Sequence, residues 1–202
     1  MARAPHSVGF FEKQFQRQVG EQDFALNPFE RLALEHARGR VLDLGCGLGN
    51  FAIEAARRGC NVTAVDGSAT GVAHTQQTAL GERLSLSAFV ADLESWSIDR
   101  DYDTIVAIGL LMFFSRERAL ALLEDIRNHV TPSGKAVINV LAGGTTFMDM
   151  FDPGHHHLFD PEELKRAFAG WDIACWQEEE FAAPGGKLKR FCTLVAQRPA
   201  AL

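Results

Sequence analysis

Val41-Leu42-Asp43-Leu44-Gly45-Cys46-Gly47-Leu48-Gly49-Asn50 is the stretch of this 202-residue sequence that decides its fold. A short apolar run ends at glycines, and a helical pattern follows at once. Gly45 and Gly47 permit backbone angles that are closed to other residues, and Gly49 allows a helix to pack closely on a strand. The stretch therefore predicts a turn at the end of a strand that contacts a ligand with its backbone.

The spacing of the glycines indicates which ligand this is. A dinucleotide-binding turn has the pattern G-x-G-x-x-G and holds a pyrophosphate at a helix N-terminus. Here the third glycine comes one position early, and Asn50 stands at the sixth position. Asp43 would be an unusual acid beside phosphates, but it suits a ligand with an ammonium group and a cationic sulfur. The pattern predicts S-adenosylmethionine, which has no phosphate.

Short apolar runs alternate with helical patterns along the rest of the chain. Strands buried on both faces are expected at 40–44, 61–65, 84–89, 102–108 and 135–140. Amphipathic helices are expected at 51–58, 68–80 and 116–129, and a further helix is expected to begin at Asp160. Strands at 171–179 and 189–197, joined by the turn 183–186, should form an antiparallel hairpin. This order predicts a parallel sheet covered by helices.

Acidic and small residues follow the ends of the next three strands. Asp66 ends the second strand, where a carboxylate can accept hydrogen bonds from both hydroxyls of a ribose. Asp92 follows the third strand, where it could bind an adenine amino group. Taken singly, such acids also fit helix caps, turns or solvated loops. Together they predict a cofactor site made of Asp43, Gly45, Cys46, Gly47, Asn50, Asp66, Gly67, Ser68, Ala91, Asp92, Leu93, Ile108 and Leu110.

With these residues, the chain resembles the class I S-adenosylmethionine-dependent methyltransferases over nearly its whole length. The resemblance implies a Rossmann-like three-layer α/β sandwich with a mostly parallel seven-stranded sheet, of order 3-2-1-4-5-7-6 and with an antiparallel last strand. It also implies S-adenosylhomocysteine as the product. Within this group, the segments similar to the tellurite-resistance methyltransferases are Tyr102-Asp103-Thr104-Ile105, Leu110-Leu111-Met112-Phe113-Phe114, Glu163-Leu164, Gly170-Trp171 and Arg190-Phe191-Cys192-Thr193-Leu194.

The sequence departs from this subfamily at one place. The resemblance implies a His-Arg pair near the end of the sixth strand, but this chain has Glu180-Phe181-Ala182 there. An oxyanion such as tellurite or selenite needs compensating positive charge, so the departure argues against that substrate. Lys187, Lys189 and Arg190 are the cations that could replace the pair.

The methyl acceptor is expected to face the end of the fourth strand. Leu111, Met112 and Phe113 are candidates for the pocket wall, with ordinary core packing as the alternative for each. His155, His156 and His157 follow the fifth strand, on a segment that commonly covers the acceptor site in this fold. A histidine there could take a proton near neutral pH, although a catalytic base is optional for methyl transfer. Adjacent side chains alternate in direction, so some of the three could simply face water.

The length of the chain favours a single domain, with residues 1–38 as an N-terminal helical lid segment and 39–202 as the Rossmann-like core. A docked helix that covers the core is the alternative for the lid. The net charge of −6 argues against a nucleic-acid partner. The longest apolar run, 104–114, is shorter than the about 20 residues that span a membrane, and residues 1–6 carry no apolar signal core.

These features predict a cytoplasmic protein whose four cysteines are reduced, with no structural bridge and no metal site. We expect an enzyme that methylates a small molecule at a thiol, chalcogen oxyanion, amine or hydroxyl, as a monomer or a homodimer. A non-catalytic S-adenosylmethionine-binding sensor or partner subunit is the alternative, because a fold does not fix a function. A nicotinamide oxidoreductase fits less well, because Asn50 stands at its last glycine position.

Overall fold

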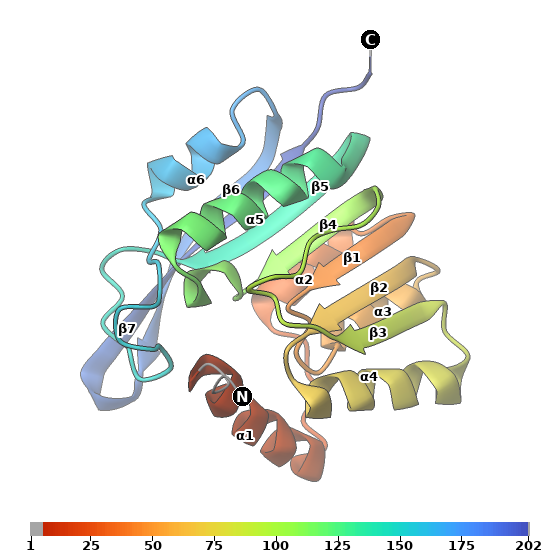
Figure 1. Ribbon diagram of the computed structural model, residues 1–202, viewed down its shortest axis with the longest axis horizontal. Helices are drawn as coiled ribbons and strands as arrows, with labels where there is room; N and C mark the ends of the chain where they lie inside the picture. The colour runs from red at the N-terminus through yellow and green to blue at the C-terminus, as the bar shows by residue number, and fades with distance from the viewer. Residues whose placement is uncertain (1–5, 202) are drawn as a thin grey trace.

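The computed structural model describes residues 6–201, which form a seven-stranded sheet between two layers of helices (Figure 1). The strands are β1 Arg40–Leu44, β2 Asn61–Asp66, β3 Leu86–Val90, β4 Tyr102–Ile108, β5 Val130–Leu141, β6 Asp172–Ala183 and β7 Lys187–Gln197. The α-helices are α1 His6–Glu21, α2 Pro28–His36, α3 Asn50–Arg57, α4 Ala69–Glu82, α5 Arg116–His129 and α6 Pro161–Ala167. Two 3-10 turns complete the description, η1 Leu111–Phe113 and η2 Pro184–Gly186.

The strand order is β3-β2-β1-β4-β5-β7-β6, which confirms the predicted topology. Strands β1 to β5 pair in parallel, and β7 pairs antiparallel with both β5 and β6. The order reverses at β1, since β2 follows on one side and β4 on the other. A reversal of this kind leaves a crevice at the carboxyl ends of the strands, where open α/β sheets bind ligands.

Alternating side chains of the strands fill two hydrophobic cores. Leu42 and Leu44 of β1 face the layer that contains α5 and α6, and they belong to one cluster with Leu122 of α5. Val41 faces the other layer and packs with Ala52 of α3. This alternation follows from the two-residue period of a strand, and it explains why the apolar runs in the sequence are nearly continuous.

Most element boundaries agree with the sequence expectation, but β5 is longer. The helix α5 ends at His129, as predicted, and the chain then enters β5 at Val130 rather than at Lys135. The intervening residues, expected to be a loop, continue the strand with an irregular register against β4. Ser133 has a positive φ of 61°, which marks the distortion. Pro132 is tolerated because it lies at this irregularity.

Gly49 has a different packing partner from the one expected. It caps the N-terminus of α3 with φ at 73°, and a Cβ there would lie 2.2 Å from Oγ1 of Thr75 in α4. The atoms nearest to such a Cβ thus belong to a second helix, α4. The glycine is needed because two helices and the turn converge at this point.

The N-terminal residues form two helices with different surroundings. Helix α2 buries Phe29, Ala33 and Leu34 and packs beside α3, so it is a docked helix of one layer. Helix α1 lies outside both layers, across the end of the sheet toward which the arrows of β1 and β2 point (Figure 1). Residues 1–5, which belong to the predicted lid and to the segment inspected for a signal peptide, lie outside the described residues.

Two further expectations concern the whole described chain. No helix within residues 6–201 is both long and apolar enough to cross a membrane. The cysteines at 46, 60, 175 and 192 all carry free thiols in the described part of the chain. Three of these thiols are buried, which fits their packing as small apolar side chains.

Candidate functional site

The glycine turn is held by hydrogen bonds to β2. The backbone N–H groups of Gly45 and Cys46 donate to the carbonyl of Val65, at 2.8 and 3.1 Å. Gly45 has φ at 77°, and a Cβ on it would lie 2.8 Å from the side chain of Leu110. The end of β4 therefore packs directly on the turn, so Gly45 and Leu110 lie together as the sequence predicted.

Asp66 joins the turn to the beginning of α4. One carboxylate oxygen accepts the N–H of Gly47 at 2.7 Å, and the other accepts the N–H of Ser68 at 2.7 Å. Burial raises the pKa of Asp66, and these two hydrogen bonds offset the effect only in part. A carboxylate has about four acceptor positions, so lone pairs remain for the hydroxyls of a ribose.

A deeper acid lies beneath the turn. Asp43 is only 4% exposed, and within residues 6–201 its Oδ2 has no hydrogen-bond partner. Burial and the negative charges of Glu30 and Asp66 hold the pKa of Asp43 well above its usual range. Oδ1 of Asn50 is buried without a partner in the same part of the structure. Buried acceptors without donors are costly, so this group fits a ligand that brings an ammonium.

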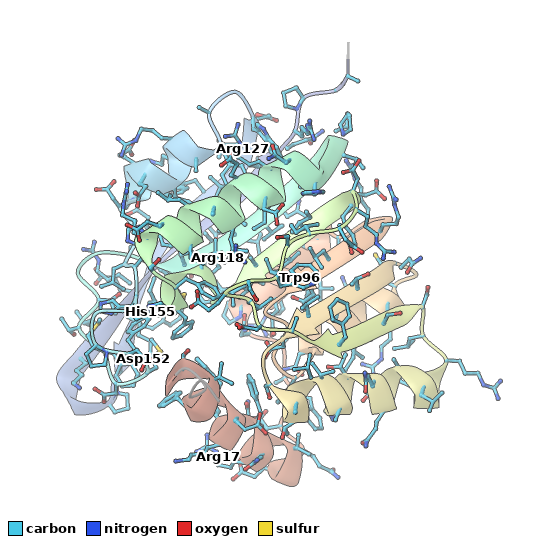
Figure 2. The ribbon with its side chains drawn as sticks, viewed as in Figure 1. Arg17, Trp96, Arg118, Arg127, Asp152 and His155 are labelled. Carbon is cyan, nitrogen blue, oxygen red and sulfur yellow. The ribbon has the colours of Figure 1, made fainter. Side chains whose placement is uncertain are left out.

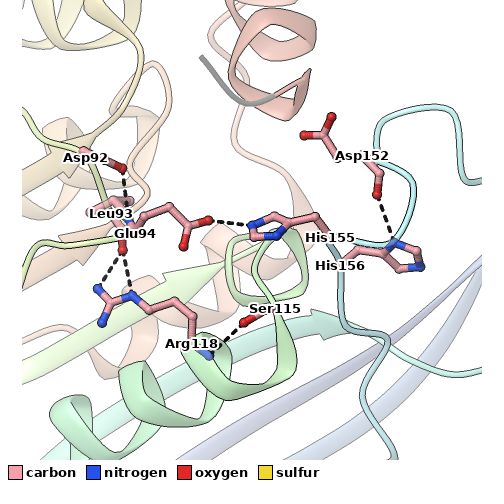
Figure 3. A network of polar contacts seen from close by, with 8 residues as sticks. All are labelled: Asp92, Leu93, Glu94, Ser115, Arg118, Asp152, His155 and His156. Atoms are coloured by element: carbon pink, nitrogen blue, oxygen red, sulfur yellow. Dashed lines mark hydrogen bonds and ion pairs between the residues drawn. The ribbon is translucent and has the colours of Figure 1, made fainter. Parts of the chain in front are cut away.

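The segment after β3 presents Ala91, Asp92 and Leu93 to the same edge of the sheet. Oδ1 of Asp92 accepts the N–H of Glu94 at 3.1 Å, and the side chain stays exposed. Leu93 is buried against the α5 layer. Arg118 of α5 holds the segment by donating to the carbonyl of Leu93 (Figure 3) and to that of Trp96. Asp92 is therefore exposed to a ligand, and Arg118 anchors its loop to α5.

The residues after β4 divide between the core and the site. Leu111 is fully buried among the α5-layer side chains. Met112 is 3% exposed and belongs to a third cluster with Met150 and Phe151. Phe113 is half-buried, with its ring 5.2 Å from that of Phe11 and 5.0 Å from that of Phe151. Phe113 thus lies where α1 and the segment after β5 come together, while Leu111 has the position of a core residue.

The three adjacent histidines have three different environments. Nε2 of His155 lies 2.7 Å from Oε1 of Glu94 in the segment after β3 (Figure 3). Nδ1 of His156 contacts the carbonyl of Asp152 at 3.2 Å. Nε2 of His157 lies 2.6 Å from Glu163 of α6, and its side chain is 14% exposed. Of the three, His155 is the one whose ring is tied to the loop that carries Asp92.

Helix α1 covers the glycine turn and the start of α4. A Cβ on Gly47 would lie 3.0 Å from the ring of Phe15, and one on Gly67 would lie 3.5 Å from Val8. Glu12 accepts hydrogen bonds from the hydroxyls of Ser68, at 2.5 Å, and Thr70. Burial alone would raise the pKa of Glu12, but these hydrogen bonds hold it below its ordinary value.

Sequence reasoning did not identify Glu12 or Phe15 as site residues. The signal was present, because Val8, Phe11, Glu12 and Phe15 have the spacing of one helix face. The prediction treated residues 1–38 only as a whole, as a helical lid segment. Glu94 was missed for another reason, since its partner His155 is 61 residues away and no local pattern joins them.

The cations that could replace the His-Arg pair of the subfamily are engaged elsewhere. Arg190 pairs with Glu180 at 2.8 Å, and Lys187 pairs with Asp149 at 2.7 Å. The ammonium of Lys189 lies 4.6 Å from the centre of the Phe147 ring, and burial lowers the pKa of this lysine. In the described part of the chain, no cluster of three or more His, Cys, Asp or Glu side chains could hold a metal ion.

Comparison with known proteins identifies relatives over most of the chain. Residues 33–189 match the family described as tellurite resistance protein TehB. A probable S-adenosyl-L-methionine-dependent methyltransferase TehB from Haemophilus influenzae is 26% identical over 166 residues, which cover 79% of this chain and 57% of the relative. Hemagglutinin 1 from Eikenella corrodens is 29% identical over 170 residues, covering 79% of this chain and 55% of that protein. The chain thus spans little more than half the length of these relatives.

Solved structures agree on the fold. The crystal structure of TehB from Haemophilus influenzae superposes with a TM-score of 0.74 at 23% identity, covering 90% of this chain and 65% of that one. The N-methyltransferase NodS from Bradyrhizobium japonicum superposes with a TM-score of 0.69 at 16% identity, covering 94% and 98%. The predicted family and fold are confirmed. The chain belongs to the TehB tellurite-resistance family and has the fold of class I S-adenosylmethionine-dependent methyltransferases.

Proposed function

We propose that this chain binds S-adenosylmethionine at the carboxyl edge of β1 to β4 and transfers its methyl group to a small-molecule acceptor. The observation that carries the proposal is the arrangement of Asp66, whose two oxygens hold the glycine turn and the start of α4 at 2.7 Å each. A buried carboxylate at this place is costly unless a ligand uses its remaining lone pairs. The ribose hydroxyls of a nucleoside are suitable donors.

The charges beneath the turn support a cationic ligand. Asp43 and Asn50 offer acceptors without partners in the described residues, and the ammonium of the cofactor would supply the missing donors. When bound, the cofactor supplies a methyl group on a positively charged sulfur. The chain's own residues would bind it, align it with the acceptor and exclude water, which is most of what methyl transfer requires.

The acceptor side supports a small molecule rather than a polymer. Phe113, Met112 and Phe151 form an apolar wall beside the histidine segment, and Phe11 of α1 closes it. The net charge of −6 opposes a nucleic-acid acceptor. Since Lys187 and Arg190 are paired with acids, a thiol, amine or hydroxyl suits the site better than a chalcogen oxyanion. The four free thiols are typical of a reducing compartment, which supports a cytoplasmic location.

Calorimetric titration with S-adenosylmethionine and S-adenosylhomocysteine tests the proposal. Asp66→Asn should weaken the binding of both by about 100-fold, near 2.7 kcal/mol, since a charged acceptor for ribose is lost. Asp172→Asn is the matched control, because Asp172 is exposed at the start of the edge strand β6, away from β1 and β2. This variant should bind both ligands as the wild type does. Wild-type protein that binds neither ligand would refute the proposal.

A non-catalytic sensor is the second candidate. Helix α1 lies on the glycine turn and its position could report occupancy of the site. Loss of the methyl group from S-adenosylmethionine in the presence of thiols, catechols, amines or selenite, followed as S-adenosylhomocysteine by mass spectrometry, separates the two. Tight binding without turnover of any acceptor would favour the sensor.

A further inference from the structure

Two loops from distant strands meet above the site. Glu94 follows β3, and His155 follows β5, and their side chains lie 2.7 Å apart. In the sheet, β3 and β5 are separated by β2, β1 and β4. Four strand spacings amount to about 19 Å, so both loops must fold over the ends of the strands between them to make this contact. The pair therefore spans the edge that carries the glycine turn.

Both arms of this bridge are fixed. On one side, Arg118 donates to the carbonyls on either side of Glu94, those of Leu93 at 2.6 Å and Trp96 at 2.6 Å. On the other side, the N–H of His155 donates to the carbonyl of Asp152 at 3.1 Å. Figure 3 shows the two side chains reaching toward one another from these anchored loops. A contact held in this way has a defined geometry, which a base needs.

The chemistry of the pair decides which ring nitrogen of His155 carries the hydrogen. An ionised carboxylate only accepts hydrogen bonds, so Nε2 of His155 carries the hydrogen that points to Glu94. Nδ1 of His155 then carries the lone pair that can take a proton. The other histidines are less suited, because Nδ1 of His156 contacts a carbonyl and His157 is nearly enclosed beside Glu163.

We propose that His155 is the general base of the reaction and that Glu94 is the positioning residue that orients it. The inference rests on the proposed function and narrows it to acceptors whose nucleophilic atom carries a hydrogen, namely thiols, hydroxyls and amines. A lone pair of that atom forms the new bond to the methyl carbon, and the carbon–sulfur bond breaks with its electron pair on sulfur. The hydrogen of the acceptor leaves as a proton to Nδ1 of His155.

This step moves one positive charge rather than creating or destroying it. The charge leaves the sulfur, which becomes a neutral thioether, and appears on the imidazolium of His155 next to the carboxylate of Glu94. Stabilising a charge that forms in the transition state is a large source of catalysis. Asp152 and His156 lie beside His155 on its own loop, and the guanidinium of Arg118 of α5 is directed to the backbone carbonyls of Leu93 and Trp96.

The test compares acceptors with and without a removable proton. Purified chain with saturating S-adenosylmethionine is given 2-mercaptoethanol and catechol in one arm and selenite in the other, since selenite reacts through a selenium lone pair. His155→Gln should lower kcat for the thiol and the catechol by about 100-fold or more, with little change in KM. It should also remove the rise in rate with pH that a general base produces. Any methylation of selenite that the wild type shows should be the same in the variant.

The variants of neighbouring residues separate a chemical role from a structural one. Glu94→Gln should lower kcat for the protic acceptors by about tenfold and keep the rise with pH, because the base is still present. His129→Gln, in the last turn of α5, is the matched control and should behave as the wild type. Unchanged turnover in His155→Gln, an equal loss for protic acceptors and selenite, or a wild type that methylates selenite alone would overturn the assignment. If the wild-type protein does not bind S-adenosylmethionine, the proposed function itself is refuted instead.

Discussion

At the edge of the sheet, the proposed cofactor side presents mainly backbone, whereas the proposed acceptor side presents side chains. The cofactor side consists of the glycine turn and Asp66, whose carboxylate accepts hydrogen bonds from the backbone N–H groups of Gly47 and Ser68. The acceptor side consists of Phe113, His155 and the α1 residue Phe11, which come from three separate segments. The backbone of the cofactor side suits one ligand in one orientation. The side chains of the acceptor side can be substituted one at a time.

This difference has a physical basis. A backbone turn requires glycine at particular positions, because positive φ angles and close approaches exclude a Cβ. Side chains that meet from separate loops have no such constraint, so their identity can vary while the loops stay in place. The cofactor side should therefore be sensitive to a single added methyl group. The acceptor side should lose activity or specificity without losing the fold.

Gly71→Ala is the change with the largest expected effect. Gly71 lies in α4, where alanine ordinarily stabilises a helix by about 1 kcal/mol. Here the new Cβ would lie 2.2 Å from the carbonyl oxygen of Gly47, which is backbone and cannot easily move. We expect a loss of roughly 3 kcal/mol of unfolding free energy, measured by urea denaturation, with loss of cofactor binding.

Gly81→Ala in the same helix is the control for this substitution. A Cβ at Gly81 meets no atom within 4 Å, so the variant should be as stable as the wild type or more stable. If the two alanine variants prove equally stable and bind the cofactor equally, then the tight contact between α4 and the turn has no energetic importance.

Asp43→Asn should raise the stability of the fold and weaken the binding of the cofactor. Because burial raises the pKa of Asp43, folding favours the protonated acid. The resulting stability is complete below the unfolded pKa of about 3.9 and is lost as the pH rises through the folded pKa. Asparagine cannot ionise, so the variant should match the wild type in acid and be the more stable protein at pH 7. Its affinity for S-adenosylmethionine should fall about tenfold, near 1.4 kcal/mol.

Denaturant titrations at several pH values and calorimetry measure both effects in the Asp43 variant. Asp172→Asn, at an exposed acid, should show neither. A variant that is less stable than the wild type at pH 7 would contradict the view that Asp43 is kept for its ligand and at a cost to the fold.

Phe15→Ala should have the smallest effect of the three. The ring lies on Gly47, so α1 must move before a ligand reaches the turn. Loss of a contact worth about 1 kcal/mol should speed cofactor association about fivefold in stopped-flow measurements. Arg17→Ala on the same helix is the control, since its side chain is 68% exposed and points away from the turn (Figure 2). Equal association rates in both variants would show that α1 does not limit entry.

The cofactor side could be predicted from the sequence because its signals are local. The strand, the three glycines and the helix follow one another directly between Arg40 and Arg57, and the buried runs of β2 and β4 place Asp66 and Leu110 beside the turn. The hairpin of β6 and β7 was equally clear from its turn at Pro184. In each case, a short sequence pattern determines the backbone conformation, and that conformation determines which residues lie side by side.

The acceptor side could be predicted only as a set of candidates. His155, His156 and His157 are chemically identical in the sequence, and their different partners depend on loops that meet in space. The extension of β5 to Val130 was also missed, because Pro132 and Gly134 resemble a loop unless the distorted pairing with β4 is known. Long-range pairing, rather than local propensity, decides these features.

The edge strand β6 has a consequence for how copies of this protein behave in solution. It is 12 residues long and forms one border of the sheet, with Ile173 and Phe181 more than a third exposed. The open hydrogen-bonding groups of such a strand invite pairing with another molecule. Three consecutive glutamates, Glu178, Glu179 and Glu180, place like charges along this border, and like charges oppose the pairing of two copies. Replacing Glu178 and Glu179 by glutamine should therefore promote aggregation through β6 and leave the crevice folded.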